Sequence, residues 1–188
     1  MTGILGGAFD PPHEGHVALA NAAREHFRVD RLLILVAAAP GHKRTVADPD
    51  TRLQLARAAF PDDDVELDPY ERTVDMLRAR RFDDPLFLIG ADQFADFLGW
   101  KEPDAVLGLA RLGVATRPGY PREALDPVLE RLARPERVEF FELEPHEAAS
   151  RDIRSRAARG EPLGAAVPPA VAELIRTRAL YRSDAGLH

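Results

Sequence analysis

The sequence predicts an α/β fold, a single Rossmann-like open parallel sheet with helices on both faces and a short helical C-terminal part. Three observations predict it. Short apolar segments of strand length alternate with segments of helical periodicity along the chain. Arg31–Ala37 and Pro85–Ile89 contain continuous apolar runs, as strands buried on both faces require. No repeat or linker divides the 188 residues, so we expect one domain over residues 1–182 and a flexible tail over 183–188.

The elements of the N-terminal half follow from local patterns. A short apolar segment before a glycine pair predicts a strand at 2–8, and apolar residues at helical spacing between Val17 and Phe27 predict a helix at 14–27. The apolar run at 31–37 predicts the second strand. Beyond a polar loop we expect a helix at 50–60, a short strand at 65–67 and a helix at 73–81.

The C-terminal half continues the same alternation. Strands are expected at 85–89, 112–116 and 138–143. Helices are expected at 91–98, 103–109, 122–133, 151–159 and 169–178. Pro168-Pro169 suits the start of the last helix, because the first turn of a helix tolerates proline. Ligands of such sheets bind beyond the carboxyl ends of the strands, where strand order reverses, so functional motifs are sought there.

Composition excludes several classes of protein. The net charge of −6 makes the chain a poor general binder of nucleic acid, which needs clustered positive charge. It has no cysteine, so disulfides, thiol nucleophiles and cysteine metal sites are excluded. No apolar run reaches membrane-spanning length and the N-terminus does not read as a signal peptide, so we expect a cytoplasmic protein without a membrane partner. The two lysines, Lys43 and Lys101, stand out against the abundant arginine.

The most informative segment is Gly6-Gly7-Ala8-Phe9-Asp10-Pro11-Pro12-His13-Glu14-Gly15-His16, which follows the first strand. The two glycines let backbone N–H groups approach a phosphate closely. His13 and His16 are three residues apart at the start of a helix, so both rings can face the same side, where the helix dipole adds positive potential. The simpler alternative is a tight turn with two surface histidines. The combination favours a polyphosphate site.

This segment resembles the (His/Thr)-x-Gly-His motif of the nucleotidyltransferase superfamily, and in detail the bacterial nicotinate-nucleotide adenylyltransferases. Ala8 stands where that family often has Thr or Ser. The resemblance, which runs from about residue 3 to 182, implies transfer of the AMP part of ATP to nicotinate mononucleotide, giving deamido-NAD and pyrophosphate. It implies catalytic roles for His13 and His16, and it implies ATP contacts at four loop positions: Gly6, Gly7, Ala8 and Phe9.

Two further segments resemble the same family. Pro40-Gly41-His42-Lys43, followed by Arg52, resembles its His-Lys loop and the arginine of the next helix. This implies that Lys43 is catalytic and follows charge on the phosphates, although a solvated loop lysine is the plain alternative. Thr73 stands at the family's Tyr-Thr-x-Asp helix start, where it would contact the nicotinate carboxylate or simply cap the helix. The family's Ser-Tyr before it is Glu71-Arg72 here.

The middle of the chain also resembles the family. Phe87-Leu88-Ile89-Gly90-Ala91-Asp92 implies that Gly90 lets the nucleotide lie against the strand end and that Asp92 accepts hydrogen bonds from ribose hydroxyls. Trp100-Lys101 implies a mononucleotide site in which Trp100 stacks on the pyridine ring. Arg117, in the family's Arg-Pro-Gly turn, would reach a phosphate of the mononucleotide or close the turn.

The last motif matches the family only in part. Its Ile-Ser-Ser-Thr-x-Ile-Arg helix start reads Ala148-Ala149-Ser150-Arg151-Asp152-Ile153-Arg154 here. The resemblance implies ATP contacts at the retained positions Ser150, Ile153 and Arg154. Ser150 can still cap the helix, whose amides can face phosphate.

The implied reaction needs no general base and no covalent intermediate, because the phosphate of the mononucleotide is already ionised. In-line positioning and charge stabilisation suffice. We expect ATP and nicotinate mononucleotide as small-molecule substrates and Mg²⁺ bound through the ATP phosphates, without a protein metal cage. Pantetheine-phosphate adenylyltransferase and a preference for nicotinamide mononucleotide remain alternatives. A non-catalytic nucleotide-binding regulatory module is the alternative of another class.

Overall fold

The computed structural model describes residues 1–41, 44–116, 122–146 and 148–182. Its sheet has six parallel strands in the order β3-β2-β1-β4-β5-β6. The strands are β1 (Thr2–Gly7), β2 (Arg31–Ala37), β3 (Asp64–Asp68), β4 (Leu86–Gly90), β5 (Arg111–Thr116) and β6 (Val138–Glu142). The α-helices are α1 (Glu14–Phe27), α2 (Pro49–Ala59), α3 (Thr73–Arg80), α4 (Ala91–Ala95), α5 (Pro103–Leu109), α6 (Asp126–Leu129), α7 (Ser150–Ala158) and α8 (Pro169–Thr177). The predicted α/β parallel sheet is confirmed.

The strand order reverses at β1, which pairs with β2 on one side and β4 on the other. Because Leu5 of β1 pairs with Leu88 of β4, the carboxyl ends of these two strands lie side by side. Gly7 ends β1 and Gly90 ends β4. In doubly wound sheets this reversal opens the crevice that receives ligands, so the glycine motif lies where a nucleotide site is expected.

Alternate residues of the strands feed two separate hydrophobic cores. Leu5, Ile34 and Val36 pack with side chains from α1, α2, α7 and α8 on one face of the sheet. Ile4 and Leu35, their neighbours in sequence, pack with side chains from α3, α4, α5 and α6 on the other face. This division follows from the two-residue repeat of a strand, and it explains why the central strands read as continuous apolar runs.

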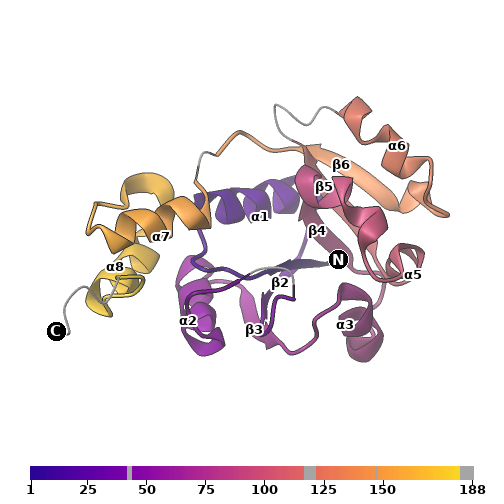
Figure 1. Cartoon of the computed structure of the whole chain (residues 1–188). Helices are drawn as coiled ribbons and strands as arrows, with labels where there is room; N and C mark the ends of the chain where they lie inside the picture. The colour runs from indigo at the N-terminus through magenta and orange to yellow at the C-terminus, as the bar shows by residue number, and fades with distance from the viewer. Residues whose placement is uncertain (42–43, 117–121, 147, 183–188) are drawn as a thin grey trace.

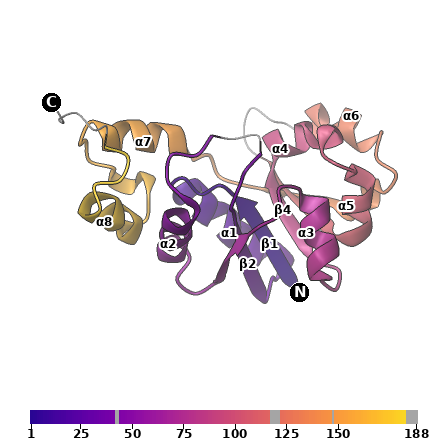
Figure 2. The same ribbon diagram turned by 60° about the horizontal axis from the view of Figure 1, so that its bottom comes forward.

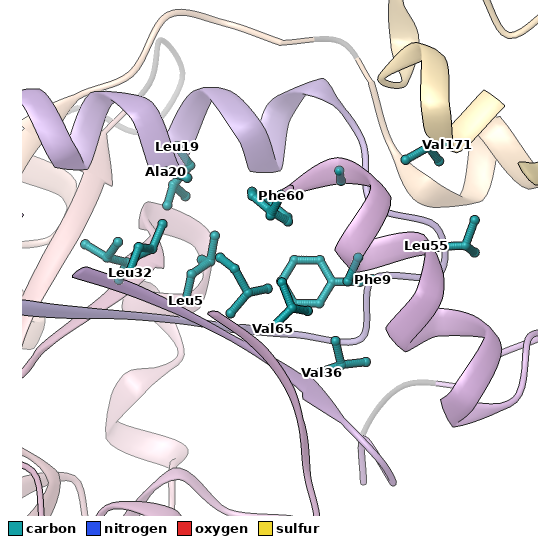
Figure 3. Packing of buried hydrophobic residues seen from close by; sticks show 14 of the residues in the cluster. Leu5, Phe9, Leu19, Ala20, Leu32, Val36, Leu55, Phe60, Val65 and Val171 are labelled. Atoms are coloured by element: carbon teal, nitrogen blue, oxygen red, sulfur yellow. The ribbon is translucent and has the colours of Figure 1, made fainter. Parts of the chain in front are cut away.

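The two C-terminal helices form a group of their own at one end of the sheet. In both ribbon views α7 and α8 lie beside α2, away from α5 and α6 (Figures 1 and 2). Figure 3 places Val171 of α8 near Leu55 of α2, within the first core. Helix α8 thus packs next to the helix that follows the 44–48 loop.

One predicted helix is wrong in extent. The segment expected as a continuous helix at 122–133 contains a short 3₁₀ turn at Arg122–Ala124 and the four-residue helix α6. Pro127 lies in the first turn of α6, and a proline there cannot donate to the preceding turn, so the helix starts anew. The expected 91–98 helix likewise divides into α4 and a 3₁₀ turn at Phe97–Gly99. Among the described residues, no helix is long and apolar enough to cross a membrane.

Candidate active site

The loop after β1 is shaped around the ring of Phe9. This residue has a left-handed backbone conformation, with φ of 49°, and its side chain is buried. The ring packs edge-on against Phe60 (Figure 3) and lies 5.0 Å, centroid to centroid, from the ring of His16. A Cβ atom at Gly7 would lie 3.1 Å from the Phe9 ring, so a larger residue here would require the buried ring to shift by a few tenths of an ångström.

The rings of His13 and His16 lie together at the start of α1, with centroids 3.9 Å apart and planes inclined by 37°. The backbone N–H of His13 donates to Nδ1 of His16 over 3.2 Å. An Nδ1 that accepts carries no proton, so neutral His16 holds its proton on Nε2 and can donate it from there. The predicted pairing of the two rings is therefore present, with the proton of His16 on the nitrogen farther from the backbone.

Burial and the neighbouring His146 lower the pKa of His13 to about 4. The ring is thus neutral at physiological pH, and its buried Nδ1 has no hydrogen-bond partner among the described residues. A neutral imidazole binds phosphate as a hydrogen-bond donor and not as a fixed positive charge. Positive charge at this end of the site must come from other groups.

Helix α7 is joined to the same loop through two of its side chains. The hydroxyl of Ser150 donates to the carbonyl of Pro11 over 2.8 Å, and Nη1 of Arg154 donates to the carbonyl of Asp10 over 2.5 Å. The side chain of Arg154 remains about a quarter exposed, so the guanidinium, with five N–H donors, can still meet an anion. Ser150 and Arg154 therefore reach the motif loop from the far end of the sequence.

A cavity of about 620 Å³ opens beyond the ends of β1 and β4. It is large enough for a small-molecule substrate. The predicted site residues that line it are Gly6, Gly7, Ala8, Thr73, Asp92, Trp100 and Lys101. The start of α3 forms part of its wall, and no side chain caps the first turn of that helix, which leaves backbone N–H groups available for an anionic group.

Trp100 is held in the cavity wall by two other aromatic rings. It meets Phe97 and Phe87 edge-on, with ring centroids 5.2 Å and 6.3 Å away. Lys101, predicted to bind the mononucleotide, donates to both carboxylate oxygens of Asp75, over 2.9 Å and 3.0 Å. The lysine therefore lines the cavity as one half of an ion pair.

The turn from β4 into α4 brings Asp92 over the end of the strand. A Cβ atom at Gly90 would lie 2.6 Å from an oxygen of the Asp92 carboxylate, closer than real Cβ contacts. A larger residue at position 90 would therefore require the Asp92 side chain to shift. This constraint comes from a neighbouring side chain, whereas the sequence interpretation, that Gly90 lets the nucleotide lie against the strand end, stays a prediction.

The structure separates the predicted residues into two groups. One group lines the cavity, and the other, with His13, His16, Ser150 and Arg154, surrounds the loop and α7. The side chains of Phe9 and Ile153 are core residues, so a contact of either residue with ATP has to use the backbone. Lys43 and Arg117 lie outside the described residues.

Sequence reasoning gave no role to three residues of this region. Asp10 lies inside the motif but is buried, His146 lowers the pKa of His13, and the hydroxyl of Tyr181 bonds Asp10. The burial of an acidic residue between two glycines and two histidines has no local signature. Tyr181 is 171 positions away from Asp10, so no spacing could have linked them.

Comparisons with known proteins agree with this arrangement. The structure resembles nicotinic acid mononucleotide adenylyltransferase of Plasmodium falciparum, solved in complex with NaAD, with a TM-score of 0.75 over 96% of both chains at 13% identity. That likeness supports the fold. A curated relative from Roseiflexus, named probable nicotinate-nucleotide adenylyltransferase, is 37% identical over 96% of this chain and 97% of its own.

Two further matches narrow the assignment. A protein of the same name from Thermus thermophilus is 38% identical over 96% of this chain and 98% of its own length. The model of the cytidylyltransferase-like family matches residues 4–159. The chain therefore belongs to the cytidylyltransferase-like nucleotidyltransferases, within the family of the nicotinate-nucleotide adenylyltransferases.

Proposed function

We propose that this chain transfers the AMP part of ATP to the phosphate of nicotinate mononucleotide, releasing pyrophosphate and forming deamido-NAD. One observation carries the proposal. The cavity that Trp100 and Thr73 line shares Gly6, Gly7 and Ala8 with the loop that leads to His13 and His16. A mononucleotide in the cavity and a polyphosphate at the loop would thus meet at the end of β1.

The chemistry follows from the groups around the loop. The mononucleotide phosphate attacks the α-phosphorus of ATP, the new P–O bond forms as the bond to pyrophosphate breaks, and no protein group takes a proton. His16 would donate from Nε2 to an oxygen of the α-phosphate, and Arg154 would offset charge on the leaving pyrophosphate. His13, neutral at working pH, would add a second hydrogen-bond donor. Lys43 remains a proposed phosphate contact.

We expect Mg²⁺ to accompany ATP, where it would offset negative charge on the phosphates. The side chains that surround the loop, two imidazoles and a guanidinium, are hydrogen-bond donors. Such a set suits phosphate oxygens and leaves the metal ion to those oxygens and to water. We propose no protein ligand for it.

The cavity favours the acid form of the mononucleotide over the amide form. Arg72 lines it just before the uncapped first turn of α3 and has no ion-pair partner among the described residues. Lys101, the other cation of the described wall, is paired with Asp75. A nicotinate carboxylate at Thr73 would accept hydrogen bonds from helix N–H groups and would be attracted by the charge of Arg72, whereas a neutral amide could accept hydrogen bonds through its oxygen but would gain no charge attraction.

Pyrophosphate release in the presence of ATP and Mg²⁺ tests the proposal. Nicotinate mononucleotide, nicotinamide mononucleotide and phosphopantetheine are compared in parallel at equal concentrations. We expect kcat/KM to be highest for nicotinate mononucleotide by at least tenfold. A preference for either other substrate would overturn the assignment, and ATP binding without pyrophosphate release from any of the three would indicate a regulatory nucleotide-binding module.

A further inference from the structure

The carboxylate of Asp10 is a buried junction between three distant parts of the chain. It is only 3% exposed. It accepts hydrogen bonds from the backbone N–H groups of Val46 and Ala47, over 2.6 Å and 3.2 Å, and from the hydroxyl of Tyr181 over 2.8 Å. The motif loop, the segment before α2 and the end of the chain therefore meet at one side chain.

Two arginines lie around this carboxylate. Arg52 is completely buried and donates to the carbonyls of Ala8 and Ala37, over 2.8 Å and 2.7 Å, with further bonds to backbone carbonyls at 38 and 47. Arg154 bonds the Asp10 carbonyl and keeps Nη1 3.9 Å from the carboxylate. Backbone carbonyls accept four of the five N–H donors of the buried Arg52, whereas the side chain of Arg154 is about a quarter exposed, so Arg154 is the better placed of the two to meet a phosphate.

The surroundings of Tyr181 keep its hydroxyl protonated, so that it can donate a hydrogen bond to Asp10. Its ring packs against the first core beside α8. Burial and the nearby carboxylate raise the pKa of its phenol, so the hydroxyl keeps its proton throughout the working range. A neutral donor satisfies the carboxylate without adding charge, whereas a cation in its place would neutralise Asp10. The hydroxyl bonds Oδ1 of Asp10, while Nη1 of Arg154 lies 3.9 Å from Oδ2, so both groups face the same carboxylate from different oxygens.

We propose that Tyr181 is a positioning residue for ATP: by satisfying Asp10 it leaves the guanidinium of Arg154 facing the triphosphate. Without the hydroxyl, Asp10 loses one of three donors inside the protein, where an unsatisfied carboxylate is costly. Arg154 is then the nearest further donor. It moves onto the carboxylate and away from the phosphates. This inference rests on the proposed function, in which Arg154 binds ATP.

The test is equilibrium binding of ATP with Mg²⁺, and separately of nicotinate mononucleotide, to wild type and Tyr181→Phe. The phenylalanine retains the ring and removes the hydroxyl. We expect the Kd for ATP to rise about tenfold, the scale of one hydrogen bond to a charged group. The Kd for the mononucleotide should stay within about twofold, because the described residues that donate hydrogen bonds to the Asp10 carboxylate do not line the cavity.

Arg178→Ala is the matched control. Arg178 hydrogen-bonds Gln54 of α2, so its replacement removes another attachment of the same C-terminal segment. The replacement does not touch Asp10. ATP binding by this variant should equal that of wild type. An equal loss in both variants, or an unchanged Kd for ATP in Tyr181→Phe, would overturn the proposal and leave Tyr181 as a structural anchor.

Two further comparisons distinguish the role proposed for Tyr181 from a failure of the proposed function. Asp10→Asn, with a neutral amide that binds Arg154 less strongly, should restore much of the ATP affinity when combined with Tyr181→Phe. If that double variant binds ATP no better than Tyr181→Phe, the competition for Arg154 is refuted. Because binding is measured without turnover, a wild type that binds ATP but releases no pyrophosphate would refute the proposed function alone.

Discussion

The motif loop after β1 and the cavity beside it differ in how deeply their charged groups are buried. Around the loop the charged groups are buried: Arg52 is 0% exposed and Asp10 is 3% exposed. At the cavity, the side chains of Lys101 and Asp75 are 48% and 36% exposed, and Arg72 is exposed too. Buried charges demand fixed partners, whereas exposed ones can be exchanged at low cost. Substitutions around the loop should therefore disturb the reaction itself. Substitutions at the cavity rim should instead change which substrate is preferred.

Loss of His16 should have the largest effect, because it acts on the loop side of this comparison. We expect His16→Ala to lower kcat by roughly 10²-fold, as when one donor to a developing charge is removed, while the Kd for the mononucleotide changes little. His26→Ala, at the other end of the same helix, is the control and should leave kcat unchanged. A fall of less than about tenfold in steady-state kcat would remove His16 from the chemistry.

Loss of Arg72 should change substrate selection on the cavity side. Arg72→Gln should reduce the preference for the acid over the amide mononucleotide by roughly fivefold, since a partly exposed charge pair contributes about 1 kcal/mol. Arg81→Gln makes the same change of charge at the other end of α3, outside the cavity wall, and should preserve the preference. The measurement is the ratio of kcat/KM for the two substrates. An unaltered ratio would show that the N–H groups at the start of α3 bind the nicotinate carboxylate without a contribution from Arg72.

Protonation of His13 should make the stability of the protein depend on pH in the acid range. Its pKa is about 4 in the folded protein and 6.5 as its ordinary value, so between these pH values the unfolded chain binds the additional proton. The free energy of unfolding should therefore fall as pH drops from 6.5 to 4, by up to about 3 kcal/mol. Thermal unfolding across this range should show a flatter profile for His13→Asn than for wild type. Parallel profiles would contradict the lowered pKa.

Breaking the ion pair at the cavity rim should have the smallest effect. Asp75→Asn removes the partner of Lys101, and both side chains are partly exposed, so stability should change by less than about 1 kcal/mol. Urea unfolding measures this change. The freed lysine should also bring the Kd for nicotinate mononucleotide down slightly, since it gains freedom to meet an anion. A large loss of stability would mean that the rim is as constrained as the loop.

Much of the fold could be predicted from the sequence because its signals are local. The second strand was predicted at Arg31–Ala37 and lies there, since a continuous apolar run that follows Asp30 and Arg31 leaves little choice for its position along the chain. The helix expected at 122–133 was wrong because helical spacing of apolar residues outweighed Pro127 in the interpretation. Strand order was not predicted in detail, because pairing between distant strands leaves no mark on either strand alone.

The candidate site was predictable only where chemistry and backbone needs coincide in a short segment. The pairing of His13 with His16 follows from such a segment. The burial of Asp10 and its bond to Tyr181 depend on how α8 packs beside α2, which is a property of the whole fold. The resemblance named segments that the structure brings to the same end of the sheet, but it did not indicate that Asp10 and Tyr181 support the loop.

The position of Tyr181 also bears on how the protein is made. All six strands and every residue of the motif loop leave the ribosome before Tyr181 does. A chain that stops short of Tyr181 can form the sheet and both histidines' helix, yet its Asp10 carboxylate lacks the phenol. On the proposal above, the nascent chain binds ATP about tenfold more tightly once Tyr181 has been added and has reached Asp10.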